Sequence, residues 1–132
     1  MKSGRPILVE ISAGELVDKI TILEIKSERI GDPAKLHNVR QELEVLRRTF
    51  ETLLPLPDGF HAVAVELKRI NESLWDIEDE IRDCERRQDF GARFVELARA
   101  VYRTNDLRAA VKRQVNDLAG SRLVEEKSYA EY

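Results

Sequence analysis

Residues able to hold a small molecule recur at three- and four-residue spacing: Asn71, Trp75, Glu78 and Arg82. Residues at this spacing share one face of an α-helix. The indole offers an apolar surface, while the amide, carboxylate and guanidinium groups form hydrogen bonds. This face is either the wall of a ligand pocket or ordinary helix packing, in which Glu78 and Arg82 form an intrahelical ion pair.

The same stretch carries a stripe of acidic residues. Carboxylate oxygens are the ligands that Mg²⁺ prefers, and all-helical nucleotide pyrophosphatases hold the ion with acids at this spacing on adjacent helices. A metal site would need a second pair of acids, for which Glu15 and Asp18 are the candidates. Most of the stripe points away from the apolar seam, so we assign no metal ligand and expect a solvated face. The acids are Glu72, Asp76, Asp79, Glu80 and Asp83.

A polar gap interrupts the apolar seam predicted for residues 89–120, at Thr104 and Arg108. Either the helix breaks near residues 104–106, or it continues with a polar layer inside the bundle. We predict a continuous helix, because Leu107 can share the core after a slight rotation. A buried guanidinium then needs a carboxylate, since an unpaired one is strongly unfavourable.

The candidate partners of Arg108 are Glu78, Glu15 and Asp18. If Arg108 instead extends to solvent, no site forms here. With other polar and aromatic side chains nearby, this layer is our predicted pocket for a small-molecule ligand. Its residues are Glu15, Asp18, Trp75, Glu78, Arg82, Tyr102, Asn105 and Arg108. We assign no catalytic residue and no cofactor, because neither His37 nor His61 has a partner at a spacing typical of triad or zinc chemistry.

Four helices would position these groups. Ser12 and Glu15 have the spacing of a capping box, which predicts a helix from there to about Ile30. Asp32 followed by proline predicts a second helix, which ends before Pro55. Asp58 and Asp89 are candidate N-caps of a third helix, to about residue 88, and a fourth, which ends at residue 120.

Apolar residues at alternating steps of three and four continue over residues 60–84, and they form a heptad-like seam of more than three heptads. Short connections between such helices imply antiparallel neighbours. We predict an all-α fold, an antiparallel four-helix bundle formed by one domain over residues 1–132. We also expect residues 123–129 to dock on the bundle, since Leu123, Val124 and Tyr129 can bury apolar area.

Composition excludes several classes of protein. Of the 132 residues, 42% are hydrophobic and 36% charged, with 25 acids against 22 bases. A protein that binds nucleic acid mainly through phosphates is expected to be basic, so we expect no such partner. No apolar run has the length of a membrane span, and the single cysteine cannot form an intramolecular disulfide. We therefore expect a cytoplasmic protein with no membrane partner.

The first predicted helix is apolar on more than one side. Leu16, Ile20 and Leu23 form its main seam, while Val17 and Ile22 widen the apolar surface. A helix of this kind must bury a second side, and a second copy of the chain is the simplest cover. We therefore expect a homo-oligomer, with a dimer as the first choice.

Several stretches also resemble a known family. They are residues 11–30 (ISAGELVDKITILEIKSERI), 74–82 (LWDIEDEIR), 100–108 (AVYRTNDLR) and 123–129 (LVEEKSY). Together they resemble the bacterial family catalogued as domain of unknown function 6165, over nearly the whole chain. The resemblance implies a small, stand-alone bacterial protein and no particular activity.

These observations lead to two functional hypotheses. The first is a cytoplasmic helical bundle that acts as a binding or assembly module and as a homo-oligomer. The alternative is a small helical enzyme that uses carboxylate and basic residues between helices, with Mg²⁺-dependent nucleotide hydrolysis as one form of it. Melting temperatures measured with and without millimolar Mg²⁺ or Mn²⁺ and a panel of nucleotides distinguish the two, because a ligand that binds the native state stabilises it.

Overall fold

The computed structural model describes residues 4–132, and within them it contains four α-helices, one short 3₁₀-helix and no strand. The prediction of an all-α fold is confirmed. The first three residues of the predicted domain lie outside the described part. The helices are α1 (Ala13–Arg29), α2 (Pro33–Phe50), α3 (Phe60–Arg86) and α4 (Ala92–Ala119), with the 3₁₀-helix at Glu51–Leu53.

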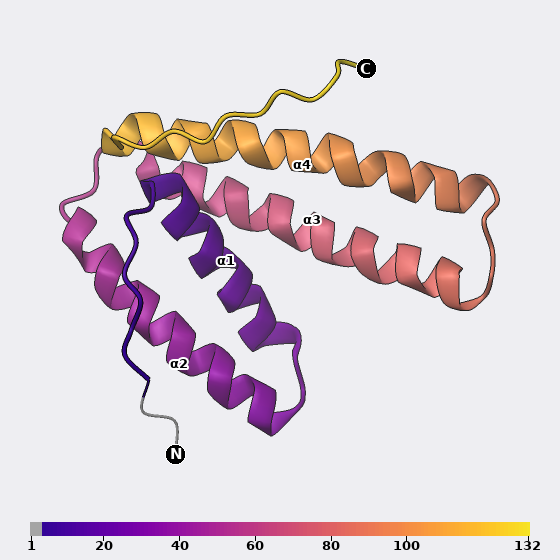
Figure 1. The fold of residues 1–132 in the computed structure, drawn as a ribbon, viewed down its shortest axis with the longest axis horizontal. Coiled ribbons are helices and arrows are strands. Elements are labelled where there is room, and N and C mark those ends of the chain that lie inside the picture. Colours follow the sequence, from indigo (N-terminus) through magenta and orange to yellow (C-terminus); the bar gives the residue numbers. More distant parts are fainter. Residues whose placement is uncertain (1–3) are drawn as a thin grey trace.

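The helices form two hairpins, α1 with α2 and α3 with α4 (Figure 1). Helix α1 contacts each of the other three helices, whereas α2 packs mainly on α1. The far halves of α3 and α4 project beyond α1 as a separate pair (Figure 1). The arrangement is therefore two hairpins that meet at α1, and not four helices aligned along their whole length.

Three of the predicted helix boundaries agree with the structure. Ser12 caps α1 by accepting a hydrogen bond from the Glu15 N–H, and Asp32 caps α2 in the same way. Helix α4 ends at Gly120, whose φ of 65° is left-handed and suits glycine. The reciprocal half of the capping box is absent from the described hydrogen bonds, because the Glu15 carboxylate turns to Lys112 instead.

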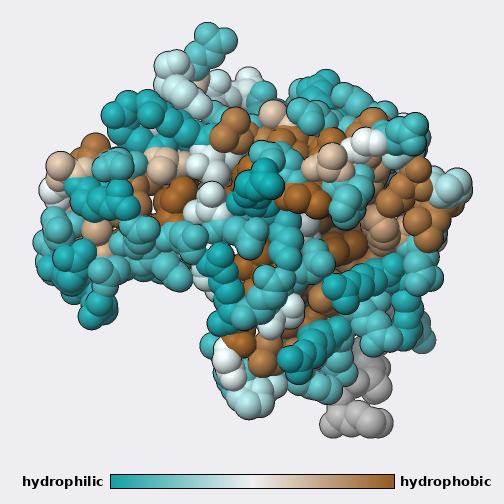
Figure 2. All heavy atoms as spheres, turned by 180° about the vertical axis from the view of Figure 1, so that it is seen from behind, coloured by the Kyte–Doolittle hydropathy of each residue, from teal (hydrophilic) through white to brown (hydrophobic). Residues whose placement is uncertain are grey.

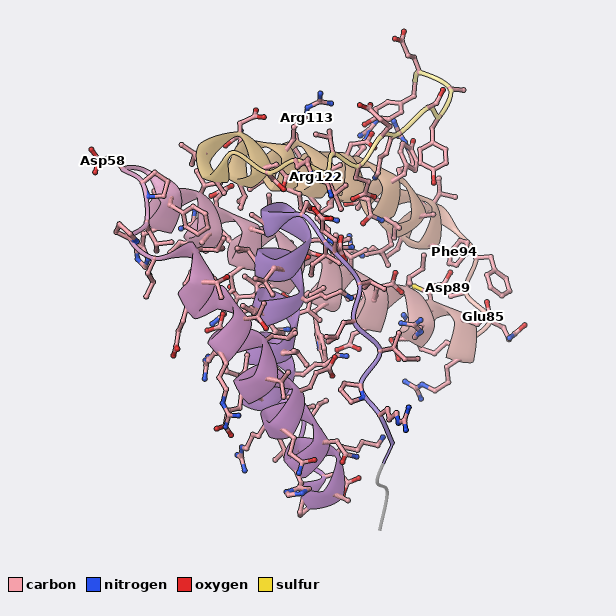
Figure 3. All side chains as sticks on the ribbon, turned by 60° about the vertical axis from the view of Figure 1, so that its left-hand side comes forward. Asp58, Glu85, Asp89, Phe94, Arg113 and Arg122 are labelled. Atoms are coloured by element: carbon pink, nitrogen blue, oxygen red, sulfur yellow. The ribbon has the colours of Figure 1, made fainter. Side chains whose placement is uncertain are left out.

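Two predicted caps are wrong. Helix α3 begins after Gly59, whose left-handed φ of 83° reverses the chain, and no side chain caps it. Asp58 points away from the helix (Figure 3). Asp89 accepts a hydrogen bond from the Gly91 N–H within the connecting loop, and α4 starts only at Ala92. In both loops the glycine adds residues to the turn, so the acid lies too early in the chain to cap.

The apolar core has two parts. The larger joins α1, α3 and α4 around Val17, Phe60, Leu67 and Val115. The smaller joins α1 and α2, and consists of Leu23, Val39 and Leu43. Figure 2 shows hydrophobic residues gathered on the back face where the hairpins meet, with mainly hydrophilic residues toward the projecting ends.

Because α1 lies between the other helices, its apolar sides are covered within the chain. Leu16, Val17, Leu23 and Ile25 are all buried. Much of the surface of the first helix that we expected to face a second copy is therefore covered by α2 on one side and by α3 and α4 on the other, while Ile20 and Ile22 are half-buried. Self-association itself stays a prediction. In the described part of the chain, no helix is long and apolar enough to cross a membrane.

The C-terminal segment after Gly120 runs along α4 (Figure 1). Polar contacts hold it: the Ala13 N–H donates to the Ser121 hydroxyl at 3.2 Å, and Glu125 pairs with Lys112 at 2.8 Å. Tyr129, which we expected to bury apolar area, is 82% exposed. Ion pairs and hydrogen bonds therefore place this segment, together with the half-buried Leu123 and the packing of Tyr132 on Tyr102.

Candidate functional site

The carboxylate of Asp18 is the centre of a buried polar layer between α1, α3 and α4. Its side chain is 1% exposed, and it receives two hydrogen bonds from one guanidinium, from the Nε of Arg108 at 2.9 Å and from Nη2. The Asn71 amide donates a third hydrogen bond to it at 2.9 Å. The prediction that α4 continues through the polar gap is confirmed, and among the three candidate acids the partner of Arg108 is Asp18.

Thr21 completes the layer. The Asn71 amide also donates to the Thr21 hydroxyl at 2.9 Å, and that hydroxyl donates to the backbone carbonyl of Asp18 at 2.8 Å. Within residues 4–132, no buried side-chain nitrogen or oxygen lacks a hydrogen-bond partner. A fully satisfied network of this kind fixes the rotamers of its members and specifies one arrangement of the three helices.

The ion pair determines the protonation of both partners. Burial alone raises the pKa of Asp18, but the hydrogen bonds from Arg108 and Asn71, with the charges of Arg108 and Lys112, outweigh it and hold the pKa below its usual value. The hydrogen bond to Asp18 raises the pKa of Arg108 further above its usual range, despite partial burial. Asp18 is therefore an ionised acid with a fixed partner.

A close approach of α1 to α4 brings these charges together. The Gly14 N–H donates to the Asn116 side-chain oxygen at 2.6 Å, and the Lys112 carbonyl lies where a side chain at position 14 would begin. Asp18 lies one turn after Gly14, and Arg108 lies one turn before Lys112. The missing side chain of Gly14 therefore allows the helix contact that sets Asp18 against Arg108.

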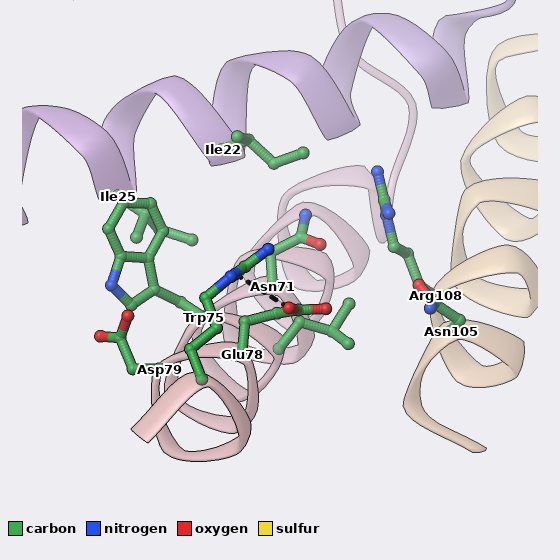
Figure 4. A pocket seen from close by; sticks show the side chains of 10 residues that line it. Ile22, Ile25, Asn71, Trp75, Glu78, Asp79, Asn105 and Arg108 are labelled. Carbon is green, nitrogen blue, oxygen red and sulfur yellow. Dashed lines mark ion pairs between the residues drawn. The ribbon is translucent and has the colours of Figure 1, made fainter. Parts of the chain in front are cut away.

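A cavity of about 390 Å³ opens beside this layer, between α1, α3 and α4. Its apolar walls are Ile22 and Ile25 from α1, and Leu74 and Trp75 from α3. Polar groups converge on it from two sides, as Figure 4 shows, with the α3 groups facing those of α4. These polar residues are Asn71, Glu78, Asp79, Arg82, Asn105 and Arg108.

Trp75 is held in place from outside the cavity. The Arg29 guanidinium lies over the indole, 5.9 Å from the ring centroid, and Arg29 is itself paired with Asp76. On the rim, Glu78 and Arg82 form the predicted intrahelical ion pair at 2.9 Å. The intrahelical ion pair is therefore present, and it forms part of the cavity wall.

A second, more polar hollow of about 270 Å³ lies on the other side of Arg108. Lys112 crosses it, pairing with Glu15 at 2.7 Å and with Glu125 at 2.8 Å. Burial alone lowers the pKa of Lys112, but the hydrogen bonds with these two carboxylates outweigh it and raise the pKa. Glu15 thus belongs to this hollow, while Asn105 and Arg108 border both hollows.

Tyr102 lies apart from the other predicted site residues. Its ring packs edge-on against Tyr132 at 5.0 Å between centroids, and it lines a separate hollow with residues of the C-terminal segment. Seven of the eight predicted residues therefore gather around the ion pair and its two hollows. The helix spacing alone does not reveal that Tyr102 packs against Tyr132 and lines a different hollow from Asn105.

The acidic stripe of α3 does not form a metal centre. Three of its five members are dispersed among surface ion pairs: Asp76 pairs with Arg29, Glu80 with Arg93, and Asp83 with the arginines that follow it. Among residues 4–132, no three His, Cys, Asp or Glu side chains are placed to hold an ion. The Asp18 and Glu15 carboxylates are directed to cations of α4 and not to this stripe.

Sequence reasoning missed three contributors to the site. Thr21 and Lys112 were not recognised, although each lies one helical turn from a residue that was, Asp18 and Arg108 respectively. Ile22 was assigned to a surface for a second copy but lines the cavity. The spacing of all three from known site residues along α1 and α4 could have identified them. That spacing predicts a contact only when it is known which face of each helix meets its neighbour.

A family model matches residues 7–132, essentially the whole chain. The chain belongs to DUF6165, a family of unknown function. No curated protein and no solved structure matches the chain. The match to DUF6165 includes every residue of the cavity and of the polar layer, so the site described above lies within the family's own sequence range.

Proposed function

We propose that this DUF6165 protein is a small-molecule binding module whose site is the cavity between α1, α3 and α4. One observation carries the proposal. A cavity of about 390 Å³ brings an indole on one side together with a half-buried guanidinium, oriented by Asp18, on the other. Cavities of about 300–1,000 Å³ with apolar walls and a few fixed polar groups are the usual form of ligand sites.

The charges of the cavity favour a particular ligand class. Arg108 is balanced by Asp18 and Arg82 by Glu78, which leaves Asp79 without an ion-pair partner within residues 4–132. The net field at the rim is therefore negative, so phosphate groups are disfavoured and an ammonium group is favoured. The ligand class we infer is a compact amine.

The opposite wall defines the other end of the ligand. The Nε and Nη2 of Arg108 bind Asp18, and its Nη1 forms no hydrogen bond within residues 4–132. The Asn105 amide lies on the same wall. These groups suit an acceptor such as a carboxylate, carbonyl or hydroxyl oxygen. Free amino acids and amino sugars combine such an acceptor with an amine and a body that can pack on Trp75.

The enzymatic alternative has less support. Asp18 is ionised and fully occupied by its partners, so it is poorly suited to exchange a proton with a substrate. The carboxylates of α3 give little support to a magnesium site, because among residues 4–132 no group of three His, Cys, Asp or Glu side chains is placed to hold an ion. We also propose a cytoplasmic location, in keeping with the buried free thiol of Cys84.

Trp75 provides the test, because it is the single tryptophan of the chain. We expect amino acids or amino sugars to change its fluorescence and to raise the melting temperature in proportion to their occupancy. Asp79→Asn removes the unpaired carboxylate and should weaken an amine ligand about tenfold, the effect of roughly 1.4 kcal/mol. Asp117→Asn, on an exposed part of α4, is the matched control and should leave binding unchanged.

Two outcomes would contradict the proposal. One is the absence of any fluorescence or melting response to the panel at millimolar concentration. The other is a response to inorganic phosphate or to nucleotides with Mg²⁺ that Asp79→Asn strengthens or leaves unchanged, which would support the alternative. A response to amines that is lost in Asp79→Asn and kept in Asp117→Asn supports the binding module.

A further inference from the structure

The arm, residues 5–11, precedes α1 and has an unusually exposed apolar centre. Ile7 is 91% exposed, Leu8 88% and Val9 74%. The arm contains no helix, turn or bend; it crosses in front of α2 in the view of Figure 1 and runs clear of α1 and α2 in Figure 3. Its backbone forms no hydrogen bond to other backbone groups of residues 4–132. Exposed consecutive aliphatic residues on an unpaired extended backbone are the features of a strand without its neighbour.

The base of the arm is held in one direction. The Glu10 carboxylate pairs with Arg122, whose Nε donates to it at 3.1 Å, and Ser12 caps α1 directly after the arm. Figure 3 shows Arg122 beside the point where the arm meets α1. The exposed part is thus carried away from the helices by a fixed base, where it is accessible to another molecule.

We propose that two copies of the chain associate through this arm, as an antiparallel two-stranded ribbon whose two-fold axis passes at Leu8. The inference does not depend on the ligand cavity. Among residues 4–132 there is no strand that could pair with the arm. A second copy supplies one with the same exposed residues, and closed two-fold dimers are the commonest assembly.

The side chains of the arm are self-complementary about Leu8. When the two-fold axis passes at Leu8, the Leu8 residues of the two copies lie opposite each other. On each side of them, Ile7 of one copy lies opposite Val9 of the other. Cross-strand pairs of β-branched residues are favourable in sheets. If the axis passed at Ile7, Pro6 of one copy would lie opposite Leu8 of the other. If it passed at Val9, Glu10 of one copy would lie opposite Leu8 of the other. Only the Leu8 register keeps the apolar residues together.

Proline supports the same register. In an antiparallel pair, residues alternate between hydrogen-bonded and non-hydrogen-bonded positions. If Leu8 occupies a non-hydrogen-bonded position, Ile7 and Val9 exchange backbone hydrogen bonds across the ribbon. Pro6 then falls on a non-hydrogen-bonded position, where its missing N–H is not needed. The positions of Pro6 and of the aliphatic residues thus agree on one pairing.

Sedimentation of the full chain tests the association. A two-stranded ribbon is only marginally stable by itself, so we expect a reversible dimer of the 15.2 kDa chain in the micromolar range. Ile7→Asp should raise the dissociation constant at least tenfold. Val45→Asp, which places the same charge at a 58% exposed aliphatic position of α2, is the matched control and should have no effect.

Cysteine substitutions test the register. Opposed residues at a non-hydrogen-bonded position have Cα atoms about 4.5 Å apart, within the range of a disulfide. Leu8→Cys should therefore form a covalent dimer rapidly in oxidised glutathione, whereas Ile7→Cys, which does not face its own counterpart, should do so much more slowly. The wild-type chain is the control, because its Cys84 is buried.

Three results would overturn the proposal. They are a monomer at every concentration tested, a dimer that Ile7→Asp leaves unchanged, and equal cross-linking of Leu8→Cys and Ile7→Cys. A chain that stays monomeric and instead adds its arm to the sheet edge of another protein would also overturn the proposal. The arm lies outside the core, so circular dichroism should show that both arm variants fold.

Discussion

Helix α1 has two unlike sides. Toward α2 it packs Leu23 against Val39 and Leu43 in an apolar cluster, beside which Glu24 and Arg47 form a partly exposed ion pair. Toward α3 and α4 it presents Asp18, which is bound by Asn71 and Arg108. Both sides are buried to a similar degree, so burial alone does not distinguish them. They differ in the kind of contact that stabilises each: apolar packing toward α2, and hydrogen bonds with an ion pair toward α3 and α4.

The apolar side is stabilised in proportion to the area that it removes from water, and it tolerates exchange for side chains of similar volume. The polar side behaves differently, because each partner is needed by the others. If one member of a buried ion pair is lost, the other stays as an uncompensated charge. We therefore expect graded effects of substitution near α2 and abrupt, coupled effects near α3 and α4.

The largest expected effect is that of Arg108→Met, which leaves the Asp18 carboxylate unpaired at 1% exposure. We expect it to lower the free energy of unfolding by about 3–5 kcal/mol, as measured by urea denaturation. In the double variant Asp18→Leu with Arg108→Met, much of this stability should return, because no charge is left unpaired.

The exposed pair of Glu44 and Arg48 is the matched control for this cycle. Removing either side chain should change stability by less than about 1 kcal/mol. If Arg108→Met changes stability by less than about 0.5 kcal/mol, neither the buried pair nor its coupling is important to the fold.

On the apolar side, Leu43→Ala should lower the free energy of unfolding by about 3 kcal/mol, through lost burial and the cavity that remains. Unlike Arg108→Met, this change should be additive with Asp18→Leu, because the two sites share no partner. Val45→Ala, at an exposed position two residues later on α2, should be nearly neutral. Strong non-additivity between the two sides would contradict the comparison.

Gly14→Ala tests whether the close approach of α1 to α4 supports the polar side. The added carbon would collide with the Lys112 carbonyl, so we expect a loss of about 1–3 kcal/mol. At Gly31 an added carbon would meet no atom within 4 Å, and Gly31→Ala should have little effect. Equal melting temperatures of the two variants would show that α1 can shift without disturbing the pair.

The pH dependence of stability should also separate the two sides. The folded-state pKa of Asp18 is lowered, so its contribution is complete above the unfolded pKa of about 3.9 and is lost as pH falls below it. Asp18→Asn should therefore flatten the acid limb of the stability profile, measured by urea unfolding between about pH 2 and 6. Leu43→Ala should leave the shape of that limb unchanged.

The smallest expected effect on stability is that of Glu125→Gln, at the solvent-exposed edge of the contacts between α1, α4 and the C-terminal segment. Glu125→Gln removes one partner of Lys112 at an exposed position, so we expect a loss of less than about 1 kcal/mol. Its clearer result should be faster amide exchange in residues 123–129, because this ion pair helps to hold the C-terminal segment on α4. Exchange at the same rate in the wild type and the variant would show that other contacts place the segment.

Local signals in the sequence determined the helices and much of their ends. Ser12, Asp32 and Gly120 act through the residues next to them, so their roles can be predicted without knowing the rest of the fold. Asp58 and Asp89 failed as caps, because glycines later in the same loops extended the turns. The sequence therefore predicts a helix end correctly where the residues of a single turn determine the cap.

The sequence also determined that Arg108 needs an acid, since it interrupts an apolar seam and a buried charge must be compensated. The sequence left three acids as possible partners of Arg108. Asp18 was selected by the approach of α1 at Gly14, which directs one turn of α1 to one turn of α4. Contacts between residues this far apart depend on the relative rotation of helices, and spacing within one helix carries no information about it.

Tertiary structure alone decided how the two hairpins meet. The heptad-like seam and the short connections predicted a four-helix bundle, but not the length over which its helices pack: α1 is 17 residues long, and α3 and α4 are 27 and 28. The shorter helix covers only part of the longer pair, and it lies between that pair and α2. Most of its apolar residues, which suggested a second copy, are therefore buried within the chain. The same geometry forms the cavity beside Trp75, because helices that do not align along their length leave space where they diverge.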